Sequence, residues 1–254
     1  MKQIILVLFL AVSFASHIAQ AQTPDFKTTL AQAEKGNIDA QNSLGLMYFN
    51  GQGVPKNAVQ AAVWIRKAAE QGYAKAQYNL GEMYFRGLAV PRDAVQAAVW
   101  IRKAAEQGDA QAQLNLGVMY FRGLGVPKDG VQALAWFRKA AEQGYAEAQD
   151  ALGNLYAIGQ DVPKDYVQSV AWYRKAAEQG YPPAQSTLGL SYYRGVGVPK
   201  DDVQALAWFI LAAAGKPEEL FRDGLRKKLS PAQVTEAVRL SSEWKPGQSI
   251  PPAH

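Results

Sequence analysis

The sequence predicts an all-α fold, a right-handed superhelical solenoid of paired helices. The main observation is that five tryptophans lie 36 residues apart, at Trp64, Trp100, Trp136, Trp172 and Trp208. An Ala-Ala pair follows each tryptophan in the same frame, and each copy carries a turn with glycine and proline at a fixed offset. A constant period of this length is typical of stacked helix pairs, in which each unit contacts only its neighbours.

Five copies of the repeat fill residues 36–215. Their period is helical within each half, and the two halves are separated by turn residues, so each copy predicts two antiparallel helices joined by a short loop. The copies are Gly36–Gln71, Gly72–Gln107, Gly108–Gln143, Gly144–Gln179 and Gly180–Gly215.

The third copy shows how each helix begins and ends. Its first helix is expected from Ala110 to Arg122, where apolar residues recur with helical spacing. Gly123 suits the left-handed position after a helix end, and Asp129 is a good N-cap for a second helix over Gly130–Gln143. One residue opposes this pattern in every copy, because a glycine stands inside the first helix, where it costs about 1 kcal/mol relative to alanine. We expect these glycines to admit a bulky neighbour, such as the tryptophan of the repeat.

The copies resemble the Sel-one-like repeat family, which is related to the tetratricopeptide repeats. The shared pattern is A-x-x-x-L-G-x-x-Y-x-x-G-x-G-V-P-x-D-x-x-x-A-x-x-W-x-x-x-A-A-x-x-G, over about residues 36–215. Three positions depart from it: Ala89 and Asp161 replace the second turn glycine, and Asn57 replaces the capping aspartate. Since alanine tolerates a positive φ less well than aspartate does, we expect a slightly rearranged turn at Ala89. The resemblance implies the fold; arrays of this kind usually bind rather than react, so we expect an interaction scaffold.

Both ends of the array are expected to carry caps. Residues 22–35 resemble the tail of a second helix and are predicted to cover the first repeat. Residues 216–245 are predicted to form C-terminal capping helices, because Ser230 to Gln233 is a capping box and Trp244 follows Trp208 by the same 36 residues. Residues 246–254 contain three prolines and no periodicity, and we expect a disordered tail.

Residues 1–21 predict a cleavable signal peptide. Lys2 precedes an apolar stretch from Ile4 to Val12, and small residues at Ala19 and Ala21 form a cleavage site. Polar residues interrupt the apolar run before the roughly 20 residues that a membrane helix needs. We therefore expect a periplasmic or secreted protein, cleaved after Ala21, with no membrane association afterwards.

The composition excludes several kinds of partner and chemistry. The chain has no cysteine, so it has neither disulfides nor a thiol nucleophile. Its net charge of +5 falls to +4 when Lys2 leaves with the signal, and acidic and basic residues alternate, so we expect no nucleic-acid partner. Its two histidines are His17, in the signal, and His254, at the terminus. No histidine-dependent triad or zinc cluster follows from this set, and we expect a non-catalytic protein without a metal or other cofactor.

A hydrolase is the alternative to a scaffold. Ser242 and Lys245 match S-x-x-K, the acylating pair of penicillin-recognising enzymes, and some cysteine-rich members of the resembled family have been described as β-lactamase-like. The companion S-D-N and K-T-G motifs are missing, and this chain lacks those cysteines. A cell-wall or β-lactam hydrolase is therefore the alternative function.

Positions that change between copies predict the binding surface, because positions that repeat build the solenoid. The variable positions of the first helices share one face, which lines the concave side in the resembled solenoids. We expect this face of a monomer to bind a protein or peptide with acidic groups or a free C-terminus. The asparagines would bind peptide backbone and the arginines would bind carboxylates. The predicted residues are Tyr78, Asn79, Glu82, Arg86, Leu114, Asn115, Arg122, Tyr193 and Arg194.

Overall fold

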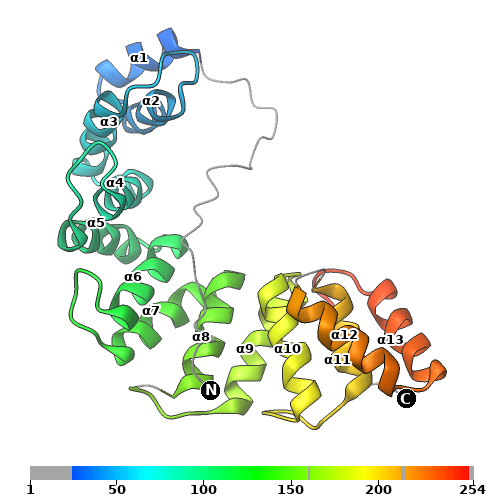
Figure 1. The fold of residues 1–254 in the computed structure, drawn as a ribbon. Helices are drawn as coiled ribbons and strands as arrows, with labels where there is room; N and C mark the ends of the chain where they lie inside the picture. The colour runs from blue at the N-terminus through cyan, green and yellow to red at the C-terminus, as the bar shows by residue number, and fades with distance from the viewer. Residues whose placement is uncertain (1–24, 160, 213–215, 252–254) are drawn as a thin grey trace.

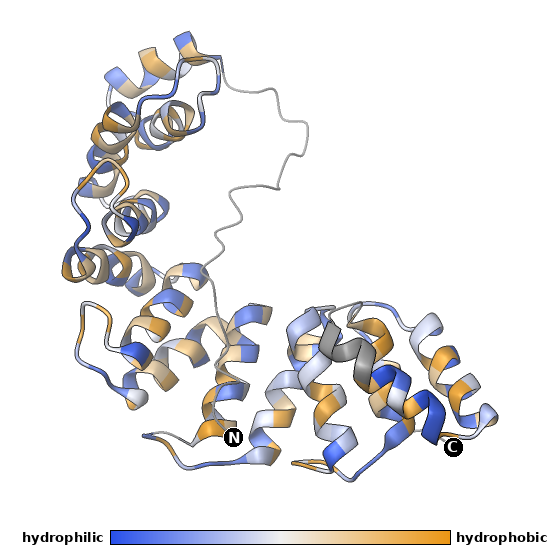
Figure 2. Ribbon diagram, viewed as in Figure 1, coloured by the Kyte–Doolittle hydropathy of each residue, from blue (hydrophilic) through white to orange (hydrophobic). Residues whose placement is uncertain are grey.

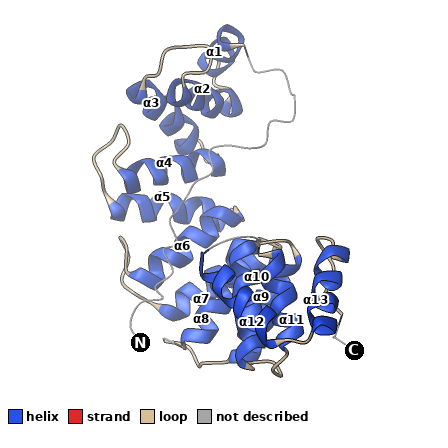
Figure 3. Ribbon diagram, turned by 45° about the vertical axis from the view of Figure 1, so that its right-hand side comes forward, coloured by secondary structure: helices blue, strands red, loops and turns tan. Residues whose placement is uncertain are grey.

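The computed structural model describes residues 25–159, 161–212 and 216–251. This part of the chain forms thirteen α-helices and contains no strand (Figures 1 and 3). The signal peptide predicted for residues 1–21 lies outside it. The helices are α1 (Phe26–Glu34), α2 (Ile38–Asn50), α3 (Ala58–Glu70), α4 (Ala74–Arg86), α5 (Ala94–Glu106), α6 (Ala110–Arg122), α7 (Gly130–Glu142), α8 (Ala146–Ile158), α9 (Tyr166–Glu178), α10 (Pro182–Arg194), α11 (Asp202–Leu211), α12 (Lys216–Lys228) and α13 (Pro231–Glu243).

Consecutive helices pack against each other along the whole array. The first repeat is α2 with α3, the second α4 with α5, and so on to the fifth, α10 with α11. The pairs follow an open arc, in which α2 and α4 lie on the inner side and α3 and α5 on the outer side (Figure 1). Apolar residues turn toward neighbouring helices and polar residues turn away from them (Figure 2). The αα solenoid predicted from the period is confirmed.

The helix ends of the third repeat agree with the sequence prediction. Helix α6 spans Ala110–Arg122 as expected, and Gly123 ends it with a left-handed φ of 70°. Asp129 caps α7, since its side chain accepts a hydrogen bond from the backbone N–H of Gln132. An aspartate or asparagine does the same for α3, α5, α9 and α11. Because the capping residue recurs at one position of the repeat, the second helix of each repeat begins at the same position.

The glycine inside each first helix admits a close neighbour, but the neighbour is not the tryptophan. A Cβ on Gly117 would lie 2.5 Å from the ring of Phe137, the residue after Trp136. Gly45 is approached in the same way by Ile65, which follows Trp64. The tryptophans lie on another side of their helices. The expectation of close approach is confirmed, and its assignment to tryptophan is wrong.

Ala89 does not rearrange its turn as expected. It adopts a φ of 60°, close to the 69° of its counterparts Gly53 and Gly125, and Asp161 adopts 58°. The conformation costs an L-residue roughly 1–2 kcal/mol. The turn packs against the preceding repeat: a Cβ on Gly125 would clash with the carbonyl oxygen of Ala94. Ala89 and Asp161 thus keep the turn conformation of the glycine copies, although the surroundings of Gly125 have no room for a Cβ.

A buried glutamine links each first helix to its neighbours. Gln77 donates from Nε2 to the carbonyl oxygen of Ala69 in the preceding repeat, at 3.2 Å. Its Oε1 accepts from Nε2 of Gln107, at 2.7 Å. One amide thus connects three helices, which is possible because it both donates and accepts. The same two bonds recur at Gln41, Gln113 and Gln149.

The second helices contribute two further recurring contacts. Arg102 donates to the hydroxyl of Tyr120 in the next repeat, at 2.7 Å. Lys103 places its Nζ 4.2 Å from the centre of the Trp100 ring, a cation–π contact. Both contacts recur in the first, third and fourth repeats. Arginine and lysine at these positions are therefore structural.

The ends of the described chain are covered as the sequence suggests. Helix α1 packs on α2, and Gln41 bonds to Ala33 as it would to a preceding repeat. Ser230 and Gln233 form the predicted capping box of α13. Helices α12 and α13 both pack on α11, where Trp244 meets Trp208 edge-on with ring centres 6.4 Å apart.

The segment after α13 differs from the expected disordered tail over residues 246–251. The backbone N–H of Gly247 donates to the carbonyl oxygen of Glu178, and Ser249 donates to the side chain of the same glutamate. Ile250 is 9% exposed and belongs to the core formed by the last two repeats and the cap. The prolines prevent a helix, but they do not prevent an extended segment from packing.

No helix within the described residues has both the length and the apolar character needed to cross a membrane.

Candidate functional site

Several predicted site residues lie in the interior rather than on the surface. Leu114 and Asn115 are each 2% exposed, and Glu82 is 4% exposed. Leu114 belongs to the central core cluster. These positions vary between copies because neighbouring repeats pack differently there, not because they face solvent. Leu114 is therefore too buried to contact a partner.

The two asparagines predicted to bind peptide backbone instead join neighbouring repeats. Asn79 donates from Nδ2 to Oδ1 of Asn42, at 3.1 Å. Asn115 donates to the hydroxyl of Tyr78 at 3.0 Å and to Glu82 at 3.2 Å. Asn115 uses both amide protons within the protein and is 2% exposed, so a backbone clamp from it is not available, whereas Asn79 uses one proton and remains half-buried.

Glu82 and Arg86 form an ion pair on α4. The distance from Arg86 Nε to Glu82 Oε2 is 3.0 Å. Burial raises the pKa of Glu82, and Arg86 and Asn115 act in the opposite direction. Desolvation, with the nearby Glu82 charge, also raises the pKa of Tyr78 above its usual range. Arg86 thus has a structural role, since it compensates the charge of a buried carboxylate that otherwise has only the amide of Asn115 beside it.

The remaining predicted residues lie near the ends of first helices. Arg122 and Arg194 are the last residues of α6 and α10, and both are exposed. Tyr193 is half-buried and meets the Phe221 ring of the cap edge-on, with centres 5.7 Å apart. Arg86, Arg122 and Arg194 share one register of the repeat, at the ends of α4, α6 and α10, and Ile158 holds this position at the end of α8 between them.

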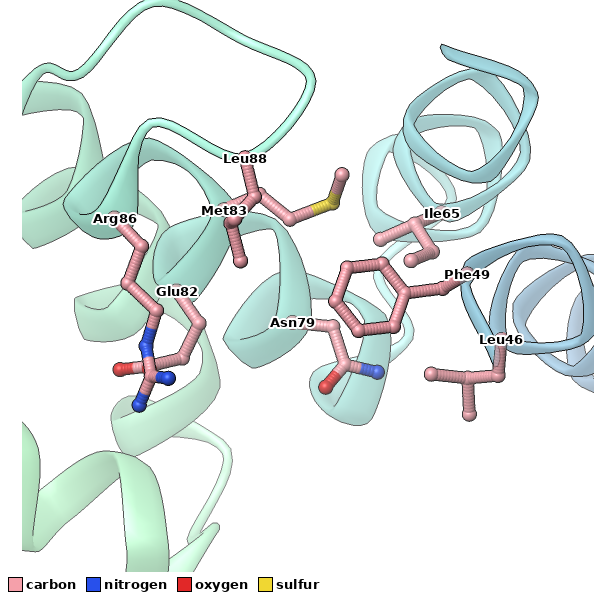
Figure 4. A pocket seen from close by; sticks show the side chains of 8 residues that line it. All are labelled: Leu46, Phe49, Ile65, Asn79, Glu82, Met83, Arg86 and Leu88. Carbon is pink, nitrogen blue, oxygen red and sulfur yellow. The ribbon is translucent and has the colours of Figure 1, made fainter. Parts of the chain in front are cut away.

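Hollows lie at equivalent places in two junctions between repeats, and they were not predicted from the sequence. The hollow between the first and second repeats measures about 20 Å³, room for about one water molecule. The ring of Phe49 points into it from α2, beside Ile65 and across from Met83 and Asn79 (Figure 4). Phe49 is the reason that so little space remains.

The equivalent hollow between the fourth and fifth repeats is open. Its volume is about 220 Å³. Ala157 stands at the position of Phe49, and Ser191 at the position of Met83. Tyr173 and Val170 are each 4% exposed and contribute to its lining, whereas Arg194 at the end of α10 is exposed. The signal was present in the sequence, since aromatic residues occupy this position in the other four copies: Phe49, Phe85, Phe121 and Tyr193.

A buried carboxylate lies behind this hollow. Asp150 is 4% exposed, and its Oδ2 accepts from Nδ2 of Asn154 at 2.9 Å. Asn154 in turn accepts a hydrogen bond from the hydroxyl of Tyr173, at 2.9 Å. Oδ1 of Asp150 has no hydrogen-bond partner among the described residues. Desolvation raises the pKa of Asp150 to about 7, so the fourth repeat contains a titratable group in its interior.

The S-x-x-K residues lack the surroundings of an acylating pair. Ser242 is exposed and donates its hydroxyl to the backbone carbonyl of Arg239. Lys245 is also exposed, just beyond the end of α13. The described residues hold no group of three or more metal-binding side chains.

The periodic contacts, the capped turns and the covered ends agree with comparison to known families. Residues 38–73, 74–109, 110–145, 146–181 and 182–216 match the Sel1 repeat. The chain belongs to the Sel1 repeat family. Proteins of this family are generally scaffolds for protein interaction. A comparison with curated proteins gave no match.

Solved structures of Sel1 repeat proteins show the same likeness. A Sel1 repeat protein from Oxalobacter formigenes is 35% identical over 79% of this chain, with a TM-score of 0.71. A protective antigen of uropathogenic Escherichia coli strains with an SLR fold is 31% identical over 86% of this chain, with a TM-score of 0.47. The alignments cover 58% and 63% of those two chains, respectively, so this chain matches only part of each.

Proposed function

We propose that this Sel1 repeat protein is a non-catalytic, exported scaffold that binds an extended segment of a partner protein on the concave side of its arc. The binding surface consists of the exposed side chains of the first helices α2, α4, α6, α8 and α10, here called the first-helix surface. The observation that carries the proposal is the shared register of Arg86, Arg122 and Arg194 on this surface.

Arginines in one register suit a partner with acidic side chains or a free C-terminus. A guanidinium binds a carboxylate with two parallel hydrogen bonds, so each such contact also sets an orientation. Arrays bind extended segments because equivalent positions recur along one direction. The first-helix surface thus favours an acidic peptide laid along the repeats.

Export to the periplasm or the medium is part of the proposal. It is supported by the order of Lys2, the apolar stretch and the Ala19–Ala21 cleavage site. We expect the protein recovered from outside the cytoplasm to lack residues 1–21. Intact-mass spectrometry measures this directly, and a mass that includes Met1–Ala21 would contradict export with cleavage.

The binding test uses a random heptapeptide library with free C-termini, selected on the full mature protein. We expect enrichment of peptides with acidic groups. The double variant R122A/R194A should bind the selected peptides more than about a hundredfold more weakly, since each charge-assisted contact contributes about 1.5–3 kcal/mol. Arg86 is left in place, because its removal would leave Glu82 without its ion pair.

The matched control is the double variant R226A/K227A, which removes the same charge from the last turn of α12, outside the first-helix surface. It should bind as the wild-type protein does, in calorimetry at one ionic strength. If both double variants bound the peptides equally weakly, the effect would come from net charge and not from the first-helix surface. Unchanged affinity in R122A/R194A would move the site off the first-helix surface.

A further inference from the structure

We propose that the hollow between the fourth and fifth repeats is an anchor pocket for one aromatic side chain of the bound peptide, with a neighbouring carboxylate held by Arg194. The pocket is lined by α8, α9 and α10 and opens beside the exposed end of α10. This inference rests on the proposed function and names the chemistry that the partner must present.

The other repeats show what shape fits. At four junction positions the chain supplies its own aromatic ring, and at the first of these the ring reduces the hollow to about 20 Å³ (Figure 4). At the fourth position Ala157 stands in place of the ring. Ser191 stands in place of the long side chain that faces the ring, which is methionine or leucine in the earlier repeats. The resulting space of about 220 Å³ therefore has the position that a phenyl ring occupies elsewhere in the array.

The polar groups of the lining favour an apolar occupant. Ser191 donates its hydroxyl to the backbone carbonyl of Thr187, at 2.9 Å. Thr187 donates to Pro183 at 3.0 Å, and Tyr173 donates to Asn154. With these protons used inside the protein, a polar ligand would find few donors in the pocket. Its volume is also below the roughly 300 Å³ at which pockets for whole small molecules begin, and it suits a single side chain.

Arg194 supplies a positive charge at the rim of the pocket. Within the described chain Arg194 makes no hydrogen bond or ion pair, in contrast to Arg86 at the equivalent position of the second repeat, which pairs with Glu82. Leu190 replaces that glutamate in the fifth repeat. The guanidinium of Arg194 is thus exposed beside an apolar pocket, and charge complementarity selects an acidic side chain or C-terminal carboxylate next to the aromatic residue.

The test compares the heptapeptide selection on the wild-type protein with the same selection on A157F. The substitution supplies the aromatic ring that the other four copies carry at this position, so the variant should fold and keep or raise its melting temperature. We expect wild-type selections to enrich phenylalanine, tyrosine or tryptophan next to an acidic group. A157F should lose the aromatic preference and bind the selected peptides about thirtyfold more weakly.

A157S is the matched control, because it keeps the pocket open and should keep both the preference and the affinity. A157M gives a second way to fill the pocket and should act as A157F does, whether or not A157F folds. R194A should retain the aromatic preference and lose the acidic one. Peptides that lack aromatics, or that bind A157F and A157M as tightly as the wild-type protein, would overturn the pocket and leave the proposed function standing.

Failure of the proposed function has a different signature. In that case no peptide would be enriched on any of these proteins. Self-association of the wild-type protein that A157F abolishes would identify a second copy of this chain as the occupant and would also overturn the peptide assignment; light scattering at several concentrations measures it.

Discussion

The first three repeats and the last two share one backbone but differ in the chemistry at their junctions. Each of the first three repeats has an aromatic ring at the junction position, namely Phe49, Phe85 or Phe121. Each also has an arginine and a lysine after the tryptophan of its second helix. The fourth repeat removes the ring and buries Asp150 instead. The fifth replaces the lysine and arginine by Leu211 and Ile210, where the cap covers them. Departures from the pattern thus coincide with the pocket and with the end of the array.

The largest effect is expected from removing the cap. A chain that ends at Leu229 loses α13 and uncovers Trp208, which is 2% exposed in the intact protein. Each large apolar side chain that becomes exposed costs about 1.5–3 kcal/mol, so the last repeat should fray and the protein should associate. Circular dichroism melting and light scattering measure both effects.

W244F is the control for this truncation, because it keeps an aromatic ring against Trp208 and should change melting only slightly. A truncated protein that remains monomeric and melts at the wild-type temperature would show that the fifth repeat does not depend on its apolar cover.

The second effect concerns the buried carboxylate of the fourth repeat. The folded state raises the pKa of Asp150 to about 7, above its unfolded value near 4, so the folded protein binds this proton more tightly. Ionising Asp150 in the folded protein lowers the free energy of unfolding. This cost is absent below the unfolded pKa, grows as pH rises from about 4 to 7, and is complete above 7. From pH 4 to pH 8 the free energy of unfolding of D150N should therefore gain about 3–4 kcal/mol relative to the wild-type protein.

Urea unfolding at the two pH values measures this difference. S186N, at the equivalent position of the fifth repeat, introduces an asparagine without removing a carboxylate, so its effect should not depend on pH. Parallel pH profiles for D150N and the wild-type protein would show that Asp150 is ionised in the folded state at little cost.

The smallest effect compares the same glycine in two repeats. A Cβ on Gly117 would lie 2.5 Å from the Phe137 ring, but one on Gly189 would lie 3.0 Å from Phe209. G117A should destabilise by about 1–2 kcal/mol net, since overpacking exceeds the gain of about 1 kcal/mol in helix propensity. G189A should be close to neutral. The midpoints of urea unfolding show which variant loses more stability. A larger loss in G189A would mean that the Phe209 ring, next to the cap, is held more rigidly than the Phe137 ring of the third repeat.

The sequence predicted the solenoid well, because each element of the repeat is fixed locally. Gly123 and Asp129 define a helix end and a helix start whatever surrounds them, and α6 has the predicted bounds. The candidate site was predicted less well, because its residues depend on contacts between repeats. Asn115 looks like a surface amide in one copy, and only the stacked neighbour shows that Tyr78 and Glu82 use its protons.

The pocket was missed for a related reason. A search for variable residues favours large or charged side chains, whereas the informative change at Ala157 is a loss of side chain. Alignment of the copies would have found it, because one copy alone lacks the aromatic ring at this position. The residue that meets each helix glycine was also misassigned, since the orientation of Trp136 relative to Phe137 depends on how the two helices of a repeat cross.

The buried glutamines have a consequence for how such a protein changes its length. Gln77 finds its acceptor in the preceding repeat and its donor in Gln107, and every other junction in the series uses the same groups in the same register. The glutamine contact is therefore the same at each of these junctions, whatever the other side chains there. Duplication or loss of a 36-residue unit therefore leaves every one of these glutamines with its acceptor, so the number of repeats can vary without loss of this contact.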